Sequence, residues 1–114
     1  MKTINEYLEE KREMQRIGAR GGVDGRLVRR MTPRLTCKDG FSMSVQVGDG
    51  KYCSPRKDGA THYTAAEIGF PSEAEPLIME WVEDADDPTG TVYGYVPITV
   101  IDAVIAKHGG FADE

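Results

Sequence analysis

The chain has 114 residues, a length that suits one domain and leaves little room for a second independent core. Hydrophobic residues make up 39% of it and charged residues 29%, which is the balance of a globular domain and excludes a disordered chain. A net charge of −5 argues against broad binding to duplex nucleic acid, which normally needs a net basic surface. We expect a single domain over residues 1–114, with a helix and a Gly-rich loop in residues 1–33 and an α+β core in residues 34–114.

The N-terminal residues are charged and contain no apolar run of the kind found in signal peptides. No stretch approaches the roughly 20 apolar residues that span a bilayer. The two cysteines, Cys37 and Cys53, lack metal-ligand spacing, and free thiols in a reducing compartment are favoured over a disulfide between neighbouring strands. These features predict a cytoplasmic protein with no membrane partner.

The first element is predicted to be an amphipathic helix, because Ile4, Leu8 and Ile17, with Met14 or Gln15 between them, recur at helical spacing among charged residues. Its narrow apolar stripe leaves open whether it packs on its own core or on a neighbouring subunit. The following residues, 18–25, are rich in glycine and are predicted to form a loop.

From residue 34 the apolar residues follow a period of two. Phe41, Met43 and Val45 alternate with polar residues, and Asp39-Gly40 and residues 48–50 on either side have turn chemistry. This pattern predicts an antiparallel meander in which Tyr93 and Tyr95 share one face of the last strand. The predicted strands are residues 34–38, 41–47, 51–54, 63–70 and 91–96.

Two further helices are predicted in the second half. Ser72 followed by Glu75 fits a capping box before a short helix with Trp81 on its inner face, and an edge strand over residues 77–82 stays open as an alternative. Pro97 suits the start of a closing helix, at whose end His108 would favourably contact the helix dipole. The expected fold is therefore α+β: an antiparallel β-meander sheet with an N-terminal helix, a short middle helix and a C-terminal helix. The predicted core face of the closing helix is Ile98, Ile101, Val104 and Ile105.

No motif predicts catalysis or metal binding. Cys53 and His62 would need an orienting third residue to form a nucleophilic pair, and none stands at a recognisable spacing. The acidic run at residues 83–87 lacks the alternating ligands of a calcium loop, and two histidines alone do not make a metal site. We expect a binding protein, not an enzyme, with no cofactor and no metal.

Residues 52–63 gather two aromatic residues, two cations and a histidine around one predicted turn. An arginine can hold a phosphate with two hydrogen bonds, a lysine adds a point charge, and an aromatic face can stack on a base. The alternative is an exposed polar hairpin whose tyrosines are half-buried. Trp81, Tyr93 and Tyr95 would then belong to the core or to the sheet surface. The candidate ligand-binding residues are Arg56, Lys57, His62, Tyr63, Trp81, Tyr93 and Tyr95.

Several stretches of residues 34–111 resemble small phage and prophage proteins of gut bacteria. We identify the chain, on that resemblance, with the Thoeris anti-defence family of phage proteins, which sequester cyclic ADP-ribose isomers made by TIR-domain immune enzymes. The stretches that carry the resemblance are residues 37–46 (CKDGFSMSVQ), 52–56 (YCSPR), 67–72 (EIGFPS), 89–97 (TGTVYGYVP) and 107–110 (KHGG).

The resemblance implies a homo-oligomer in the host cell cytoplasm that binds a cyclic nucleotide without cleaving it. An alternative follows from the charge distribution, because eleven acidic residues and only one basic residue, Lys107, follow Ala66. That acidic half would suit a phage inhibitor that binds a host defence protein directly and mimics nucleic acid.

Overall fold

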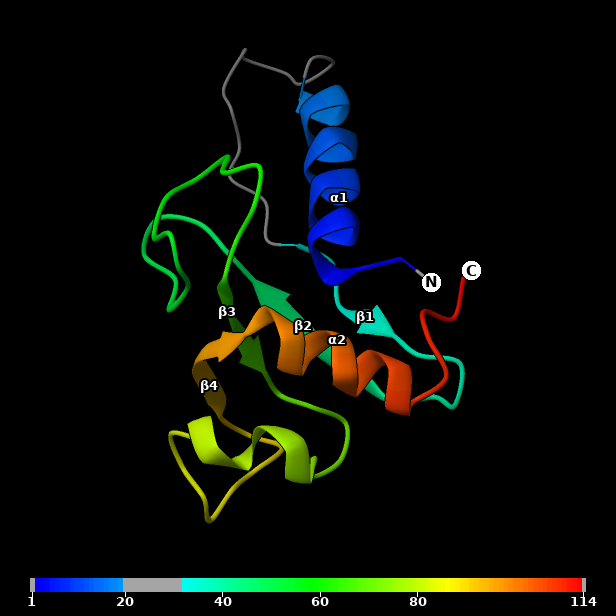
Figure 1. Ribbon diagram of the computed structural model, residues 1–114, viewed down its shortest axis with the longest axis vertical. Helices are drawn as coiled ribbons and strands as arrows, with labels where there is room; N and C mark the ends of the chain where they lie inside the picture. The colour runs from blue at the N-terminus through cyan, green and yellow to red at the C-terminus, as the bar shows by residue number, and fades with distance from the viewer. Residues whose placement is uncertain (1, 20–31, 114) are drawn as a thin grey trace.

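The computed structural model describes residues 2–19 and 32–113 and confirms the α+β class (Figure 1). The four strands form one antiparallel sheet in the order β1-β2-β3-β4, which is the predicted meander. The middle helix is a short 3-10 helix, η1, and not an edge strand. The elements in chain order are α1 (Ile4–Ala19), β1 (Leu35–Thr36), β2 (Ser42–Gln46), β3 (Ala65–Gly69), η1 (Pro76–Trp81), β4 (Val92–Pro97) and α2 (Ile98–Lys107).

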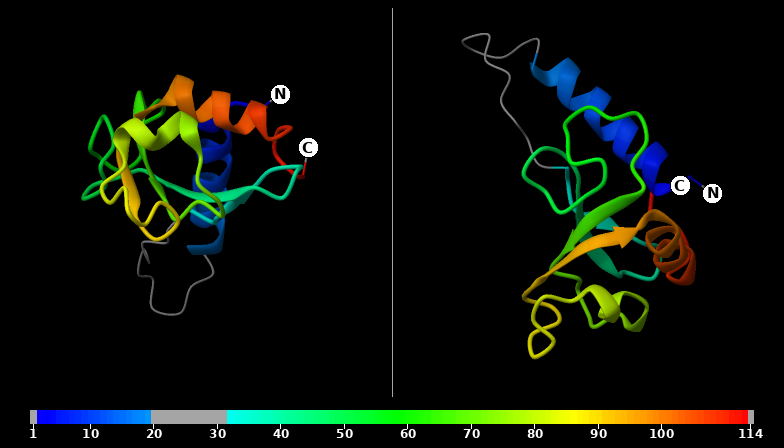
Figure 2. Two further views of the ribbon diagram at one scale, coloured as in Figure 1. Left: turned by 90° about the horizontal axis from the view of Figure 1, so that it is seen from below. Right: turned by 60° about the vertical axis from the view of Figure 1, so that its left-hand side comes forward.

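One face of the sheet is apolar and buried. Met43 and Val45 of β2 lie beside Ala66 and Ile68 of β3, and each of the four is at most 1% exposed. Figure 2 (left) shows α2 and η1 on the same side of the sheet. Their apolar side chains join those of the strands in one hydrophobic core, as the period-two and period-3.6 patterns predict.

The N-terminal helix packs on its own core. Ile4 and Leu8 are buried, and the Ile4 amide donates a hydrogen bond of 2.8 Å to Oδ1 of Asp102 in α2. Asn5 adds a paired contact, because its side-chain amide donates to the Tyr63 carbonyl (3.0 Å) and its carbonyl oxygen accepts from the Tyr63 amide (2.9 Å). The side chains of residues 13–19 and most of the predicted 18–25 loop lie outside the described residues.

The predicted strand over residues 51–54 was wrong. Only Ser54 forms a single bridge, to Ala65, because local turns use the hydrogen bonds that a ladder would need. The Lys51 amide donates to the Gly48 carbonyl, and Cys53 donates both to the Lys51 carbonyl through its amide and to the Gly48 carbonyl through its thiol. Residues 48–63 therefore form an irregular loop beside the sheet (Figure 1).

The predicted capping box was also wrong. Ser72 Oγ accepts a hydrogen bond from the Ser42 amide, so it is not available to cap η1. Glu75 is itself the N-cap, and its carboxylate accepts from the Leu77 amide at 2.9 Å. Phe70, directly after β3, has a positive φ of 50° and is 49% exposed.

No helix in the described part of the chain is both long enough and apolar enough to cross a membrane. Cys37 and Cys53 are both free, as the sequence favoured, and the structure also shows that both are buried. Burial, with a smaller contribution from Asp39, raises the pKa of the Cys37 thiol to about 11.

Candidate functional site

A β-bulge in β4 turns Tyr95 out of the sheet. Ala66 of β3 pairs with Val96 of β4, and Ile68 of β3 pairs with Tyr93 of β4. The one residue between Ala66 and Ile68 therefore lies opposite two residues of β4, Gly94 and Tyr95. Tyr95 has a φ of 57°, in the left-handed region that costs a non-glycine residue energy. Because of this extra residue, Tyr93 and Tyr95 do not share a face as predicted: Tyr93 is fully buried and Tyr95 is 46% exposed.

The exposed Tyr95 ring lies beside a second tyrosine and an arginine. The Tyr52 and Tyr95 ring centroids are 5.9 Å apart with the planes inclined by 43°. The Arg56 guanidinium carbon lies 5.5 Å from the Tyr52 centroid, within the range of a cation–π contact. We call these three residues, Tyr52, Arg56 and Tyr95, the tyrosine–arginine patch.

Backbone contacts hold this patch in position. The Tyr95 amide donates a 2.9 Å hydrogen bond to the Tyr52 carbonyl, which joins the bulge to the 48–63 loop. Gly94 leaves room for Tyr52, since a Cβ at position 94 would lie 3.2 Å from the Tyr52 Cβ and 3.5 Å from its Cγ. The patch thus combines two exposed aromatic faces and a cation on a surface fixed by the sheet, a combination that suits stacking on a base and binding of a phosphate.

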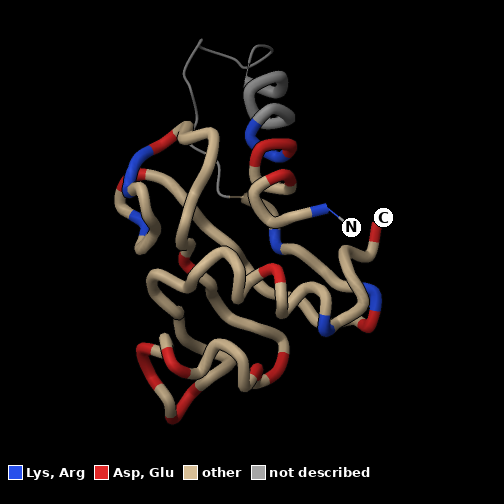
Figure 3. The backbone as a smooth tube through the Cα atoms, viewed as in Figure 1, with Lys and Arg blue, Asp and Glu red and all other residues tan. Residues whose placement is uncertain are grey.

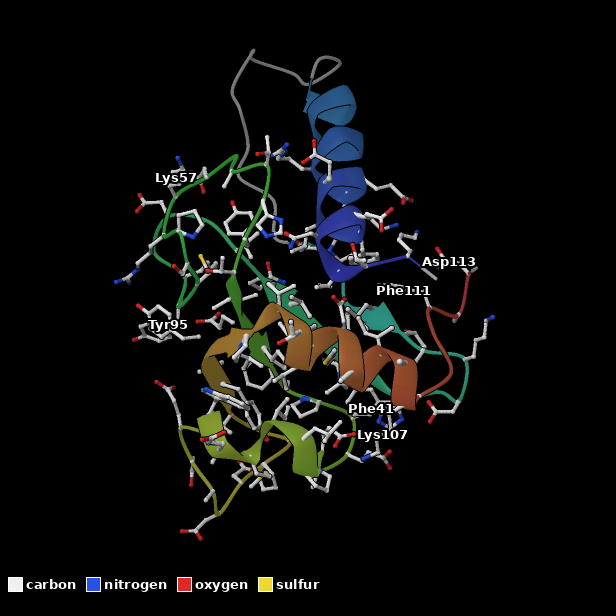
Figure 4. The ribbon with its side chains drawn as sticks, in the orientation of Figure 1. Phe41, Lys57, Tyr95, Lys107, Phe111 and Asp113 are labelled. Carbon is white, nitrogen blue, oxygen red and sulfur yellow. The ribbon has the colours of Figure 1, made fainter. Side chains whose placement is uncertain are left out.

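The structure brings only two of the seven predicted residues, Arg56 and Tyr95, into this patch. Lys57 is exposed, but Figure 4 shows it well apart from Tyr95 along the long axis of the molecule. His62 is also exposed and lines a different surface, an open depression of about 450 Å³ beside α1 that includes Glu6 and Asp102. Both carboxylates accept hydrogen bonds from backbone amides at the start of α1, so this depression is part of the helix docking.

The other predicted aromatic residues belong wholly or largely to the core. Tyr63 is 4% exposed, and its hydroxyl donates to the Lys57 carbonyl at 2.8 Å, so it fixes the loop from within. Tyr93 donates to the Pro88 carbonyl at 2.6 Å, and burial raises its pKa. Trp81 is half-buried and packs against the core from η1. The core position that the alternative allowed for Tyr93 is confirmed, whereas Tyr63 is more buried than the half-buried tyrosine that the alternative described.

Tyr52 was absent from the predicted set and completes the patch. Its place beside Arg56 in the segment 52–56 was a signal, but only the bulge in β4 brings Tyr95 next to it. A second group that the sequence did not reveal surrounds His108, which is 6% exposed and lies between the carboxylates of Asp39 and Glu75. Its expected role as a contact with the helix dipole misses these two partners.

The described residues contain no group of three or more His, Cys, Asp or Glu side chains that could hold a metal ion. No protein-family model matches the chain, and no curated protein or solved structure matches it either.

Proposed function

We propose that this protein is a phage anti-defence protein that binds a cyclic nucleotide immune signal, a cyclic ADP-ribose isomer, and holds it without cleaving it. The proposal places the base of the ligand against Tyr95 and Tyr52 and a phosphate at Arg56. It includes self-association of the chain and action in the host cell cytoplasm, both of which follow from the family resemblance.

The observation that carries this proposal is the strained position of Tyr95. A large aromatic side chain half-exposed to water gains little from burial, and a left-handed backbone at a non-glycine residue costs about 1–3 kcal/mol. Strain of this kind is concentrated at functional positions, where bulges redirect side chains. A ligand that stacks on the ring gives Tyr95 a function that offsets this cost.

Binding to purified protein tests the proposal. We expect calorimetry to detect a cyclic ADP-ribose isomer in a panel that also contains cyclic dinucleotides, and mass spectrometry to find the bound molecule intact after heat release. The Tyr95→Ala variant should raise the Kd about 5- to 150-fold, the equivalent of the ~1–3 kcal/mol that a base stacked on an aromatic ring contributes.

Tyr93→Phe is the matched control, because it alters a buried tyrosine of the same strand and should leave the Kd unchanged. Release of a cleaved product would contradict sequestration. Failure to bind any cyclic nucleotide, or equal Kd values for Tyr95→Ala and the native protein, would contradict the proposed site.

A second candidate is direct binding to a basic host protein, favoured by the charge distribution. No Lys or Arg occurs between residues 58 and 106. Figure 3 shows acidic residues gathered around η1 and the loop that follows it. This candidate replaces the first if the protein binds no nucleotide but forms a stoichiometric, salt-sensitive complex with a basic partner that is lost in an Asp84→Asn, Asp86→Asn double variant. The exposed acidic residues of this region are Glu73, Glu80, Glu83, Asp84, Asp86 and Asp87.

A further inference from the structure

A buried imidazole joins three elements at the end of α2 remote from the tyrosine–arginine patch. His108 Nδ1 lies 2.6 Å from Oδ2 of Asp39, in the turn between β1 and β2. Nε2 lies 2.8 Å from Oε1 of Glu75, the N-cap of η1. The ring also stacks on Phe41, with centroids 4.0 Å apart and planes 10° from parallel.

The other contacts of the two carboxylates fix the protonation state of this ring. Glu75 also accepts from the Leu77 amide and from Lys107 Nζ, each at 2.9 Å, and Asp39 accepts from the Phe41 amide at 2.9 Å. Both carboxylates are therefore already acceptors of other donors, which favours their ionised form. An imidazole between two ionised carboxylates satisfies both only when both its nitrogens carry protons.

We propose that protonated His108 is a pH-dependent clasp, which holds η1 and the β1–β2 turn to the end of α2 and opens locally when the ring loses its proton or when Glu75 gains one. No contact to the ligand patch is needed for this role, so it is independent of the proposed nucleotide binding. The opening would release the N-terminal end of η1 and the chain after α2, where the Lys38 amide donates to the Gly110 carbonyl at 3.0 Å.

The direction of the pH effect follows from the groups that face the ring. Burial alone would lower the pKa of His108, but the hydrogen bonds and charges of Asp39 and Glu75 outweigh it and raise the pKa above its ordinary value of 6.5. The stabilisation is thus complete below 6.5 and is lost as the pH rises through the raised value. Lys107 faces the cluster with the same charge as the imidazolium, but it contacts Glu75 and supports that carboxylate's ionised form.

At acidic pH the stability changes with pH in the opposite direction. Burial would raise the pKa of Glu75, but the Leu77 amide, Lys107 and His108 together lower it below its ordinary value of 4.5. The contribution of Glu75 is present above 4.5 and is lost as the pH falls through the lowered value. The clasp is therefore fully closed between about pH 4.5 and 6.5, and it weakens on both sides of that interval.

Nuclear magnetic resonance of the histidine rings tests the proposal in the intact chain. We expect the His108 ring, assigned with a His62→Asn variant, to carry protons on both nitrogens at pH 6.5 and to titrate above that pH. After correction for base catalysis, exchange protection of the Leu77 and Lys38 amides should fall through the same titration. The protection factor of these two amides should fall about tenfold for each unit by which the pKa of His108 is raised. The amides that join β3 to β4 should stay protected.

Two variants that each remove one carboxylate from the region of η1 separate the clasp from a general charge effect. Glu75→Gln should abolish the pH-dependent step at Leu77, whereas Glu80→Gln, on the exposed side of the same helix, should keep it. Titration of the ring at or below pH 6.5 would overturn the proposal. So would opening of the sheet amides together with Leu77, because the transition would then be global.

Discussion

Tyr95 combines a left-handed backbone with an exposed aromatic ring, as Phe70 also does. Its backbone occupies the left-handed region, yet the residue is 46% exposed and its ring lies beside that of Tyr52. At an ordinary strand position, a protein with glycine is less stable than the same protein with alanine by roughly 0.5–1 kcal/mol, because glycine loses more backbone freedom on folding. At a left-handed position the glycine variant should be the more stable one, because alanine carries a Cβ into a conformation that only glycine adopts without cost.

We therefore expect Tyr95→Gly to be more stable than Tyr95→Ala by about 1 kcal/mol, measured as the free energy of unfolding in urea. Both variants should lose ligand binding, since both lack the ring. A Tyr95→Ala variant as stable as Tyr95→Gly would show that the bulge does not constrain this residue. The reference pair is Thr99→Gly and Thr99→Ala in α2, where the alanine variant should be the more stable one.

At the scale of elements, two polar side chains of α1 join this helix to the 48–63 loop. Asn5 both donates to and accepts from the backbone of Tyr63, and Arg12, about two turns further along α1, donates to the Ala60 carbonyl at 2.9 Å. The helix has few buried apolar residues among those described, principally Ile4, Tyr7 and Leu8. These polar contacts therefore have a large part in fixing its position.

Removing the Asn5 side chain leaves the Tyr63 amide and carbonyl without their partners. We expect Asn5→Ala to lower the free energy of unfolding by about 1–3 kcal/mol, the usual cost of leaving partly buried polar groups unsatisfied. The measurement is urea denaturation followed by circular dichroism. Glu10→Ala on the exposed side of α1 loses only a surface ion pair with Lys2 and should cost less than about 1 kcal/mol. Equal effects of the two variants would contradict the role given to Asn5.

The elements with regular patterns were the ones predictable from the sequence. The period-two run of β2 and the apolar face of α2, Ile98, Ile101, Val104 and Ile105, are buried as expected, because a single periodicity determines which side chains point inward. The bulge in β4 breaks that rule: one extra residue moves Tyr93 inward and Tyr95 outward. Gly94 is the only local sign of this register, because an isolated glycine within a strand often marks a bulge or a close approach of the backbone.

The candidate site was predictable only in part for the same reason. Arg56 and Tyr52 lie close in sequence, but their meeting with Tyr95 depends on pairing between distant segments. The partners of His108, at positions 39 and 75, are 69 and 33 residues away in the chain. The sequence around His108 therefore predicts only its place at the end of a helix. Long-range contacts of this kind carry no periodic signal.

At the scale of the whole molecule, one hydrophobic core joins all the described elements. It includes residues of α1, of every strand, of η1 and of α2, and it contains both cysteines. Cys37 lies beside the C-terminal segment, where it pairs with Phe111, whereas Cys53 lies at the base of the 48–63 loop with its Sγ 3.3 Å from the Gly48 amide nitrogen. The two thiols therefore report on different parts of the same core.

A chain of this kind should unfold in a single cooperative step, since the elements that the structure describes share one core. We expect a thiol reagent to label Cys37 and Cys53 over the same range of urea concentration, and that range to coincide with the change in Trp81 fluorescence. Single-cysteine variants, Cys37→Ala and Cys53→Ala, assign the signal to each thiol, with each curve compared to the fluorescence transition of the same variant. Labelling of Cys53 at urea concentrations where Trp81 is still native would show that the loop beneath the tyrosine–arginine patch opens on its own. In that case the patch would not be fixed by the sheet, and the rigid stacking surface on which the proposed ligand binding depends would be lost.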